Sequence, residues 1–377
     1  MASTHIQPLT LWIGTFPVAG IGTAAGLGEG IWRTELDPAT GELSPAVQVC
    51  EVPAPSFLVR HPDAPVVHAT AEAEPEGAVS VLAVEGDTLR PLSRVSSAGA
   101  APTHLAQLPG LLVASNYADG TVGVIPLDGT GRPAGDTAGL RHSGSGPRAD
   151  RQEGSHAHSA TVAPGGRVVL VCDLGTDELR RLRVEDDGGR VRLTEDGTAH
   201  RFAPGSGPRH AVFLPDGRHL LVVTELSAEV VLLEWDGEVA TEVSRTDLAA
   251  GAPGPHLPSH LVLSHRDDAP GYLLDVADRG PGTLVTLGVA EDGNAIRLLG
   301  RTQAGVSWPR HFAVVGAPGG RSLIVVAGET DGVVRVLERT PGSALPHLLP
   351  GGTHVPSPAF VLVESGVVDR APEDLHR

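Results

Sequence analysis

The amino-acid sequence predicts an all-β protein, a seven-bladed β-propeller whose blades are four-stranded antiparallel sheets. Three observations lead to this prediction. A short motif recurs seven times along the 377 residues, and each copy opens a series of short apolar runs. The 48 glycines and 32 prolines follow no collagen-like period, and they punctuate the apolar runs as turns. Many short strands joined by such turns are typical of all-β folds.

The recurring motif is a proline or other small residue, then one variable residue, then His or Phe ahead of an apolar strand. Its third residue recurs at steps of 47 to 54 residues, at Phe57, His104, His158, His210, His260, His311 and Phe360. A near-constant step of this length corresponds to one blade of a propeller. The remaining interpretation, a two-sheet β protein with accidental repeats, has to explain all seven copies.

The fourth repeat shows the internal organisation of one unit. Residues 210–214, 219–224 and 229–235 are apolar enough to form strands, and a weaker fourth strand follows them. A Pro-Asp-Gly turn at 215–217 joins the first two strands, with proline and glycine where tight turns favour them. Four antiparallel strands in this order make up one blade.

The two ends of the chain are predicted to close the ring together. The seventh motif copy is followed by one strand only, 360–364, so its partners must come from 11–15, 31–36 and 46–52. Sharing one blade between the termini covers sheet edges that would otherwise stay open. We therefore expect residues 1–377 to form a single propeller domain.

Composition excludes several classes of function. The formal net charge is -17, with no basic cluster, which argues against a nucleic-acid surface. An acidic body also repels anions at long range, so an anion site needs a local group of Arg and His. The sequence contains no lysine, which excludes a Schiff-base lysine and a phosphate-binding loop of the Walker type.

Nothing in the sequence predicts export or membrane insertion. The N-terminus lacks the basic and apolar regions of a signal peptide, and no apolar run approaches about 18 residues. Cys50 and Cys172 are the only cysteines, so no disulfide framework is indicated. We expect a cytoplasmic protein, a monomer or weak dimer, without a nucleic-acid or membrane partner.

The repeat predicts where the functional residues gather. The first strand of each blade lines the channel and the second returns beside it, so first-strand starts and second-strand ends share one end of the channel, which we call the mouth. First-strand starts carry His104, His158, Arg209, His210, His260, Arg310 and His311. Second-strand ends carry Asn116, Asp173, Glu225, Asp278, Arg279 and Glu329. Arginine binds carboxylate or phosphate, and histidine transfers protons near neutral pH, so the mouth favours an anionic, hydrolysable small molecule.

Individual positions have alternative interpretations. The recurring histidines can serve blade architecture, with each imidazole bonded to the neighbouring blade. His158 ends a long polar loop, which favours a catalytic role. His156 and His158 alternate along a strand and so face opposite sides, which argues against a metal site. The predicted substrate-binding residues are His104, Asn116, His210, Arg310 and His311.

An ordered series of short segments resembles the seven-bladed propeller lactonase family, which includes propeller-type 6-phosphogluconolactonases and carboxymuconate cyclases. The markers span nearly the whole chain and include Asp37–Leu43, Asn116–Gly120, Arg151–His158, Gly207–His210, Glu225–Leu226 and Pro309–His311. The resemblance implies an active site of His158, Arg209, Glu225 and Arg279, with no metal or cofactor. Thr224 and Asp278 stand where family members often carry Asn, and the Asp278 charge beside Arg279 is expected to weaken binding of a doubly charged phosphate.

The leading hypothesis is a hydrolase that opens a small, anionic lactone of the 6-phosphogluconolactone type. Arg209 and Arg279 would bind the anionic group or polarise the carbonyl, and His158 or Glu225 would activate water. No Gly-x-Ser-x-Gly nucleophile elbow is present, so direct attack by water is favoured. Two alternatives stay open at this point: a lactone-forming cyclase or isomerase of the carboxymuconate type, and a non-enzymatic binding module.

Overall fold

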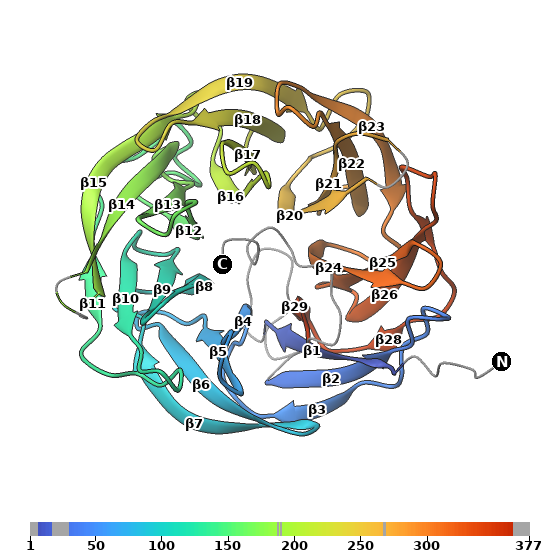
Figure 1. Ribbon diagram of the computed structural model, residues 1–377, viewed down its shortest axis with the longest axis horizontal. Coiled ribbons are helices and arrows are strands. Elements are labelled where there is room, and N and C mark those ends of the chain that lie inside the picture. Colours follow the sequence, from blue (N-terminus) through green and yellow to red (C-terminus); the bar gives the residue numbers. More distant parts are fainter. Residues whose placement is uncertain (1–6, 17–29, 187, 189–190, 267–268, 365–377) are drawn as a thin grey trace.

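The computed structural model describes residues 7–16, 30–186, 188, 191–266 and 269–364. Seven antiparallel sheets stand around a central axis like the blades of a propeller (Figure 1), which confirms the predicted fold class. We number the blades by the seven motif copies. The described residues contain no helix long and apolar enough to cross a membrane.

The strands follow the predicted repeat. Blade 1 comprises β4 (Leu58–Arg60), β5 (Val66–Ala71), β6 (Ala78–Glu85) and β7 (Thr88–Ser96). Blade 2 comprises β8 (Pro102–Leu108), β9 (Leu111–Asn116), β10 (Val122–Pro126) and β11 (Ala138–Leu140). Blade 3 comprises β12 (Ala157–Val162), β13 (Val168–Asp173), β14 (Glu178–Asp186) and β15 (Val191–Arg201). Blade 4 comprises β16 (Pro208–Phe213), β17 (His219–Thr224), β18 (Glu229–Trp235) and β19 (Ala240–Asp247). Blade 5 comprises β20 (Pro258–His265), β21 (Tyr272–Asp278), β22 (Thr283–Val289) and β23 (Ile296–Gln303). Blade 6 comprises β24 (Pro309–Ala317), β25 (Arg321–Gly328), β26 (Val333–Arg339), β27 (His347–Leu348) and β28 (Thr353–His354). It exceeds the expected four strands because β27 and β28 both pair with β26.

Blade 7 joins the two ends of the chain, as predicted. It consists of β29 (Pro358–Val363), β1 (Leu9–Thr15), β2 (Ile31–Leu36) and β3 (Val47–Cys50) in that order. Beyond the ladder, Glu364 accepts a hydrogen bond from Trp12 Nε1 at 2.7 Å and pairs with Arg60 Nε of blade 1 at 3.1 Å. The last described residue therefore links both sides of the closure.

Hydrophobic contacts between blades hold the ring together. Among the described residues, each of the seven inter-blade interfaces has its own cluster of buried apolar side chains. Between blades 3 and 4, for example, Leu179 packs in one cluster with Phe213 and Trp235. Burial of apolar area of this kind stabilises a fold by roughly 25 cal/mol per Å². Each blade is thus held by its two neighbours.

The start of the first strand is irregular in a way that recurs. In blade 4, Pro208 pairs with Thr224 and His210 with Val223, so Arg209 is one extra residue in the ladder. The same shift occurs in blades 2 and 6, next to Pro102 and Pro309. Such bulges re-aim a side chain relative to the regular strand. In blades 2, 4 and 6 the bulge therefore redirects the variable residue of the motif, whereas in blade 3 it redirects His158.

The residue just before the motif is left-handed in five blades. Its φ lies between 44° and 61° at Ala54, Ala101, Gly207, Trp308 and Ser357. This backbone conformation costs about 1–3 kcal/mol for a residue other than glycine, and it persists where surrounding structure enforces it. In these five blades the chain thus enters the motif through a sharp bend at the mouth.

Candidate active site

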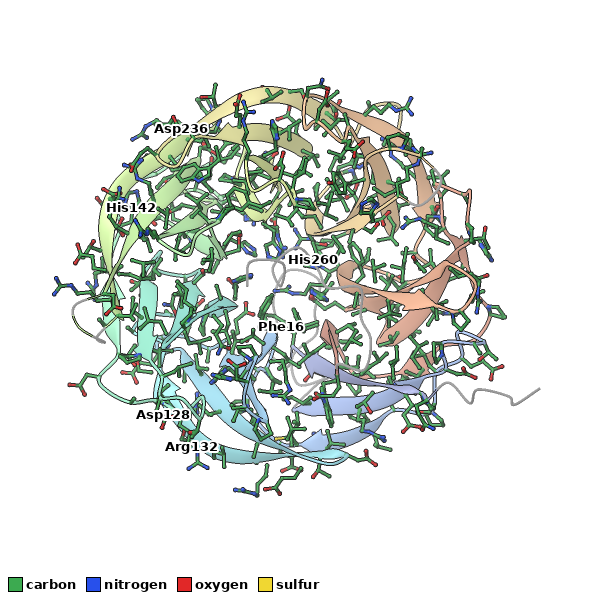
Figure 2. The ribbon with its side chains drawn as sticks, in the orientation of Figure 1. Phe16, Asp128, Arg132, His142, Asp236 and His260 are labelled. Atoms are coloured by element: carbon green, nitrogen blue, oxygen red, sulfur yellow. The ribbon has the colours of Figure 1, made fainter. Side chains whose placement is uncertain are left out.

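The strand pairing brings the predicted residues to one end of the channel. Because Pro208 pairs with Thr224, the start of β16 lies beside the end of β17, and Arg209 meets Glu225. Figure 2 shows His260 and Phe16 near the centre of the ring, whereas Asp128 and Asp236 lie at its rim. First-strand starts and second-strand ends thus share one mouth, as the repeat predicts.

Glu225 is the centre of a compact group of charges. Its side chain is 2% exposed. Its Oε2 lies 2.8 Å from Arg209 Nε and 2.7 Å from Arg279 Nη2, and its Oε1 lies 2.6 Å from Arg151 Nη2. Three guanidinium groups surround one carboxylate, so this part of the mouth carries excess positive charge inside an acidic protein.

Arg151 and Tyr117 are two members of the site that the sequence did not identify. Arg151 lies in the loop before β12, and its Nη2 also donates to Tyr117 Oη at 3.2 Å. Tyr117 directly follows β9, as Glu225 directly follows β17. The signal for Tyr117 was available, since it occupies the repeat position of Glu225.

Backbone contacts and an aromatic ring orient two of these arginines. Arg209 Nη1 donates to the carbonyl oxygen of Ser259 in the next blade. Arg279 Nε donates to Leu257 O at 3.0 Å, and its guanidinium lies 5.4 Å from the ring of the left-handed Trp308. Cation–π contacts of this type favour a fixed guanidinium. Both arginines are therefore positioned before any ligand binds.

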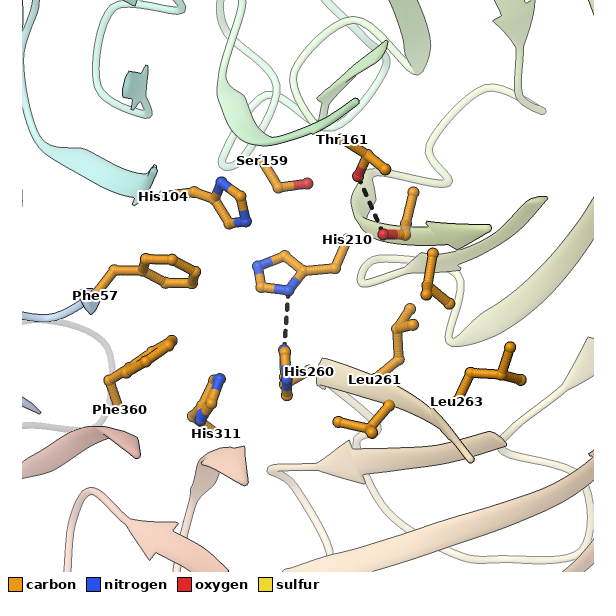
Figure 3. Close-up of a pocket in the computed structure, with 13 residues that line it drawn as sticks. Phe57, His104, Ser159, Thr161, His210, His260, Leu261, Leu263, His311 and Phe360 are labelled. Carbon is orange, nitrogen blue, oxygen red and sulfur yellow. Dashed lines mark hydrogen bonds between the residues drawn. The ribbon is translucent and has the colours of Figure 1, made fainter. Parts of the chain in front are cut away.

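Six of the seven third motif residues form a ring of aromatic side chains around the axis. Figure 3 shows this ring from within a pocket; its members are Phe57, His104, His210, His260, His311 and Phe360, and Ser159 takes the place of the blade 3 member. Neighbouring centroids lie as close as 3.9 Å, between His260 and His311 and between His311 and Phe360. We call this set the aromatic ring.

The aromatic ring separates the mouth from a deeper cavity. A cavity of about 160 Å³ is lined by ring members and by residues further along the first strands, including Ala211, Leu261 and Leu263. These strands run away from the mouth, so the cavity lies on the far side of the ring from Glu225. The charged residues and the cavity are therefore two different environments.

Two ring histidines bond to the neighbouring blade. His311 Nδ1 accepts a hydrogen bond from Val361 N at 3.2 Å, and His104 Nδ1 accepts one from Ala160 N at 3.5 Å. Burial lowers the pKa of His104 to about 3, with a further contribution from Arg209. These contacts match the architectural interpretation of the repeat. Substrate binding by His104 and His311 stays a prediction.

His210 and His260 contact each other at the centre of the ring. Their Nδ1 atoms lie 3.2 Å apart, and His210 Nε2 lies 3.3 Å from Arg209 Nη1. An arginine can only donate, so His210 Nε2 accepts and its Nδ1 carries the proton toward His260. His210 is thus the ring member in direct contact with the charged group.

His158 does not belong to the aromatic ring; it is the extra residue of the blade 3 ladder, the position that Arg209 holds in blade 4. Its Nδ1 is buried and has no hydrogen-bond partner among the described residues. Its ring centroid lies 5.5 Å from Tyr117 and 5.4 Å from His210. Burial, and next the charge of Arg209, lower the pKa of His158 well below its ordinary value. The imidazole is neutral and keeps a nitrogen available.

A second charged group stands at the same mouth. Arg310 Nη1 lies 2.9 Å from Glu329 Oε2, and Arg310 Nη2 lies 3.8 Å from Glu72 Oε1. Glu72 also accepts a hydrogen bond from Ser56 Oγ, and the ring of Phe16 lies 4.8 Å from the Arg310 guanidinium. The sequence had assigned Arg310 to substrate binding, and the structure gives it two carboxylate neighbours.

The side chain of Asn116 forms hydrogen bonds with backbone carbonyl oxygens. It is fully buried, and its Nδ2 donates to Ser97 O at 3.0 Å and Thr121 O at 2.9 Å. These bonds hold the turn that follows β9. The predicted contact of Asn116 with substrate is untested, but its amide nitrogen is already used by the fold.

The Asp278 carboxylate contacts other groups than the Arg279 guanidinium, and its expected effect on phosphate binding stays a prediction. The Asp278 carboxylate lies 2.5 Å from His256 Nδ1 and accepts a hydrogen bond from Leu257 N at 2.9 Å. It holds the loop before β20, as Asn116 holds its own turn. The carboxylate that contacts Arg279 is Glu225.

Comparison with known proteins identifies the family. The family model described as "Lactonase, 7-bladed beta-propeller" matches residues 10–363. The chain belongs to this lactonase family. This confirms the resemblance found in the sequence, and with it the prediction that the chain is a lactonase-type enzyme.

Relatives of this lactonase match it over four fifths of its length or more. The 6-phosphogluconolactonase of Bacillus subtilis (strain 168) is 27% identical over 354 residues, which span 93% of this chain and 97% of the relative. The 6-phosphogluconolactonase of Formosa agariphila is 23% identical over 318 residues, 81% of this chain and 88% of the relative. The periplasmic gluconolactonase of Pseudomonas aeruginosa superposes with a TM-score of 0.83 at 26% identity, covering 95% of this chain and 99% of its own.

The electrostatics of this charged group follow from burial and the arginines. Burial alone raises the pKa of Glu225, but the three surrounding arginines outweigh it and hold that pKa well below its ordinary range. Burial and the charge of Arg279 lower the pKa of Arg209 to about 9, so it remains protonated at neutral pH. The described residues contain no group of three or more His, Cys, Asp or Glu arranged to hold a metal ion.

Proposed function

We propose that this lactonase opens a small lactone with an anionic group by direct, metal-independent attack of water. The observation that carries the proposal is the group of three arginines around one buried carboxylate, beside a neutral histidine. Fixed guanidinium groups bind an anion or a developing oxyanion, and each such donor contributes roughly 10²–10³-fold to a rate. The substrate class agrees with the names of the relatives, which act on gluconolactone or its 6-phosphate.

His158 is the better candidate for the general base. Both oxygens of Glu225 contact arginines, and its low pKa makes it a weak proton acceptor. His158 is neutral and its Nδ1 is unpartnered among the described residues. Binding of an anion would offset the charge of Arg209, which is one cause of the low pKa of His158, and would therefore raise its basicity.

The reaction then proceeds in two steps. Water attacks the carbonyl carbon as its proton passes to His158, and the carbonyl electrons move to an oxygen faced by the arginines. Collapse of this intermediate breaks the bond to the ring oxygen, which takes the proton from the imidazolium. One lactone and one water give one hydroxy acid, and the enzyme returns to its starting state.

The proposal is tested by proton release from a panel of lactones in the presence of a chelator. The panel contains 6-phosphogluconolactone, gluconolactone and simple unsubstituted lactones, each corrected for spontaneous hydrolysis. We expect chelator-resistant turnover, fastest with an anionic lactone. Turnover that disappears with the chelator contradicts the metal-independent mechanism, and turnover of no lactone contradicts the proposed function.

A further inference from the structure

The mouth contains two arginine–glutamate pairs built from the same repeat positions. Arg209 and Arg310 are both the variable residue of a motif, and Glu225 and Glu329 both directly follow a second strand. The Arg–Glu separations are 2.8 Å in blade 4 and 2.9 Å in blade 6. The repeat thus produces the same pair twice, two blades apart.

The surroundings of the two pairs have opposite charge. Two further arginines contact Glu225, so the blade 4 pair has excess positive charge. A further carboxyl group, Glu72, lies beside Arg310, so the blade 6 pair gains an acidic group instead, one whose pKa is raised by burial. Glu72 follows β5 and so occupies the same repeat position as the other two glutamates. The mouth is therefore divided into an arginine-rich half and a glutamate-rich half.

Glu329 has one oxygen available as an acceptor. Its side chain is 0% exposed, and Oε2 is paired with Arg310. Its Oε1 is buried and has no hydrogen-bond partner among the described residues. A buried acceptor without a donor costs about 1–3 kcal/mol. A ligand hydroxyl can supply the missing donor, whereas a carboxylate or phosphate dianion offers only acceptors and is repelled.

We propose that Glu72, Arg310 and Glu329 form a hydroxyl-binding subsite that selects polyhydroxylated ligands. Glu329 Oε1 accepts a hydrogen bond from a ligand hydroxyl, and Arg310 holds the two carboxylates in place. The ligand's anionic or carbonyl end then faces the arginine-rich half. This orientation rests on the proposed function, but selection for hydroxyl groups depends on the glutamate-rich half alone.

The test compares two ligands that differ in their hydroxyl groups only. Gluconate and hexanoate share a six-carbon chain and a carboxylate, and calorimetric titration gives the ratio of their dissociation constants. In wild type we expect preference for gluconate. Glu329→Met removes the acceptor and should reduce this preference by about 10- to 100-fold, the range for a hydrogen bond to a charged group. Glu329→Gln keeps an uncharged hydrogen-bonding group and should reduce it less.

Glu338→Met is the matched control. Glu338 forms an arginine–glutamate pair with Arg321 in the same blade, but Arg321 begins β25, at the end of that strand remote from Glu329. The control should keep the wild-type preference. If Glu329→Met does not fold, Glu329→Gln becomes the test, and it should still lower the preference for gluconate over hexanoate.

The outcomes separate the subsite from the proposed function. Equal loss of both ligands in the Glu329 variants, an unchanged preference, or a wild-type protein that does not bind gluconate overturns the subsite. If the wild type hydrolyses lactones but the Glu329 variants keep its preference for gluconate, the proposed function stands and the proposed subsite is wrong. If the wild type prefers gluconate, the Glu329 variants lose that preference, and no lactone is hydrolysed, the proposed subsite stands and the proposed function is wrong.

Discussion

At the scale of single residues, the contacts of each carboxylate decide its role. Glu225 has three arginine neighbours and stays ionised, so its role is to fix those arginines. Asp278, at the end of another second strand, binds a histidine and a backbone amide instead. Proton transfer requires a free nitrogen, and Nδ1 of His158 has no hydrogen-bond partner in the described part of the chain. Sequence analysis left the base open between His158 and Glu225, because it could not show which oxygens were already occupied.

His158→Ala should lower kcat by about 10²–10⁴-fold, the usual contribution of a general base. The loss arises because His210 Nε2, the other neutral nitrogen beside Arg209, is already hydrogen-bonded to that arginine, whereas His158 Nδ1 has no partner among the described residues. Rates of proton release give kcat, and urea denaturation shows that the variant remains folded. A folded variant with wild-type kcat contradicts the assignment of His158 as the base.

Asp278→Asn should leave the KM for a phosphorylated lactone close to the wild-type value, because the carboxylate contacts His256 and not Arg279. The variant loses the ion pair with His256 and should therefore unfold at lower urea concentration. Steady-state kinetics and urea denaturation measure the two effects. A tenfold lower KM with unchanged stability would restore the original expectation that Asp278 repels phosphate.

At the scale of elements, the repeat predicted the strands and the mouth. In part of the site, however, the residues chosen from the sequence lie one position before those that stand at the mouth. The side chain that ends a second strand holds its own turn, as Asn116 does. The next residue stands at the mouth; this series is Phe16, Glu72, Tyr117, Leu174, Glu225, Arg279 and Glu329. Strand bounds from sequence are uncertain by a few residues, which is enough to miss Tyr117. Arg151 was missed because it lies in a loop without a repeat position.

The aromatic ring should make stability depend on pH. Burial lowers the pKa of His260 to about 3, whereas an unfolded histidine has its ordinary value of 6.5. As the pH falls, the unfolded chain therefore binds protons before the folded protein does. The contribution of this histidine to the free energy of unfolding is fully present above pH 6.5 and is lost as the pH decreases toward 3. Each such histidine contributes a slope of about 1.4 kcal/mol per pH unit in this window.

His260→Phe should remove one such contribution. Phenylalanine already occupies the equivalent positions in blades 1 and 7, at Phe57 and Phe360. We expect the free energy of unfolding, measured by urea denaturation between pH 6 and pH 4, to depend less steeply on pH by about 1.4 kcal/mol per unit. An unchanged slope means that His260 is protonated in the folded state, contrary to this account.

At the scale of the whole molecule, ring closure and charge distribution matter most. The joint blade 7 was predictable because the last repeat lacked three strands, and the structure pairs β29 with β1. The opposed halves of the mouth were not predictable, since they depend on which distant side chains meet. A protein with a net charge of -17 concentrates three arginines around one carboxylate. That local excess allows an acidic protein to bind an anion.

Glu364→Ala should weaken ring closure. The change removes the hydrogen bond from Trp12 and the ion pair with Arg60, which link β1 and blade 1 to the end of the chain. We expect a loss of about 1–3 kcal/mol in the free energy of unfolding by urea. Glu85→Ala, in an exposed pair with Arg90, is the control and should change stability little. Equal effects of the two changes contradict a special role for Glu364.

The most direct test of the central claim is the rate of proton release from 6-phosphogluconolactone with chelator present, for wild type, Arg209→Ala and His158→Ala. The account predicts rapid turnover by wild type and a loss of at least about 100-fold in each variant, since one removes a fixed positive charge and the other the base. Turnover that both folded variants retain at the wild-type rate would place the chemistry outside this mouth and contradict the account.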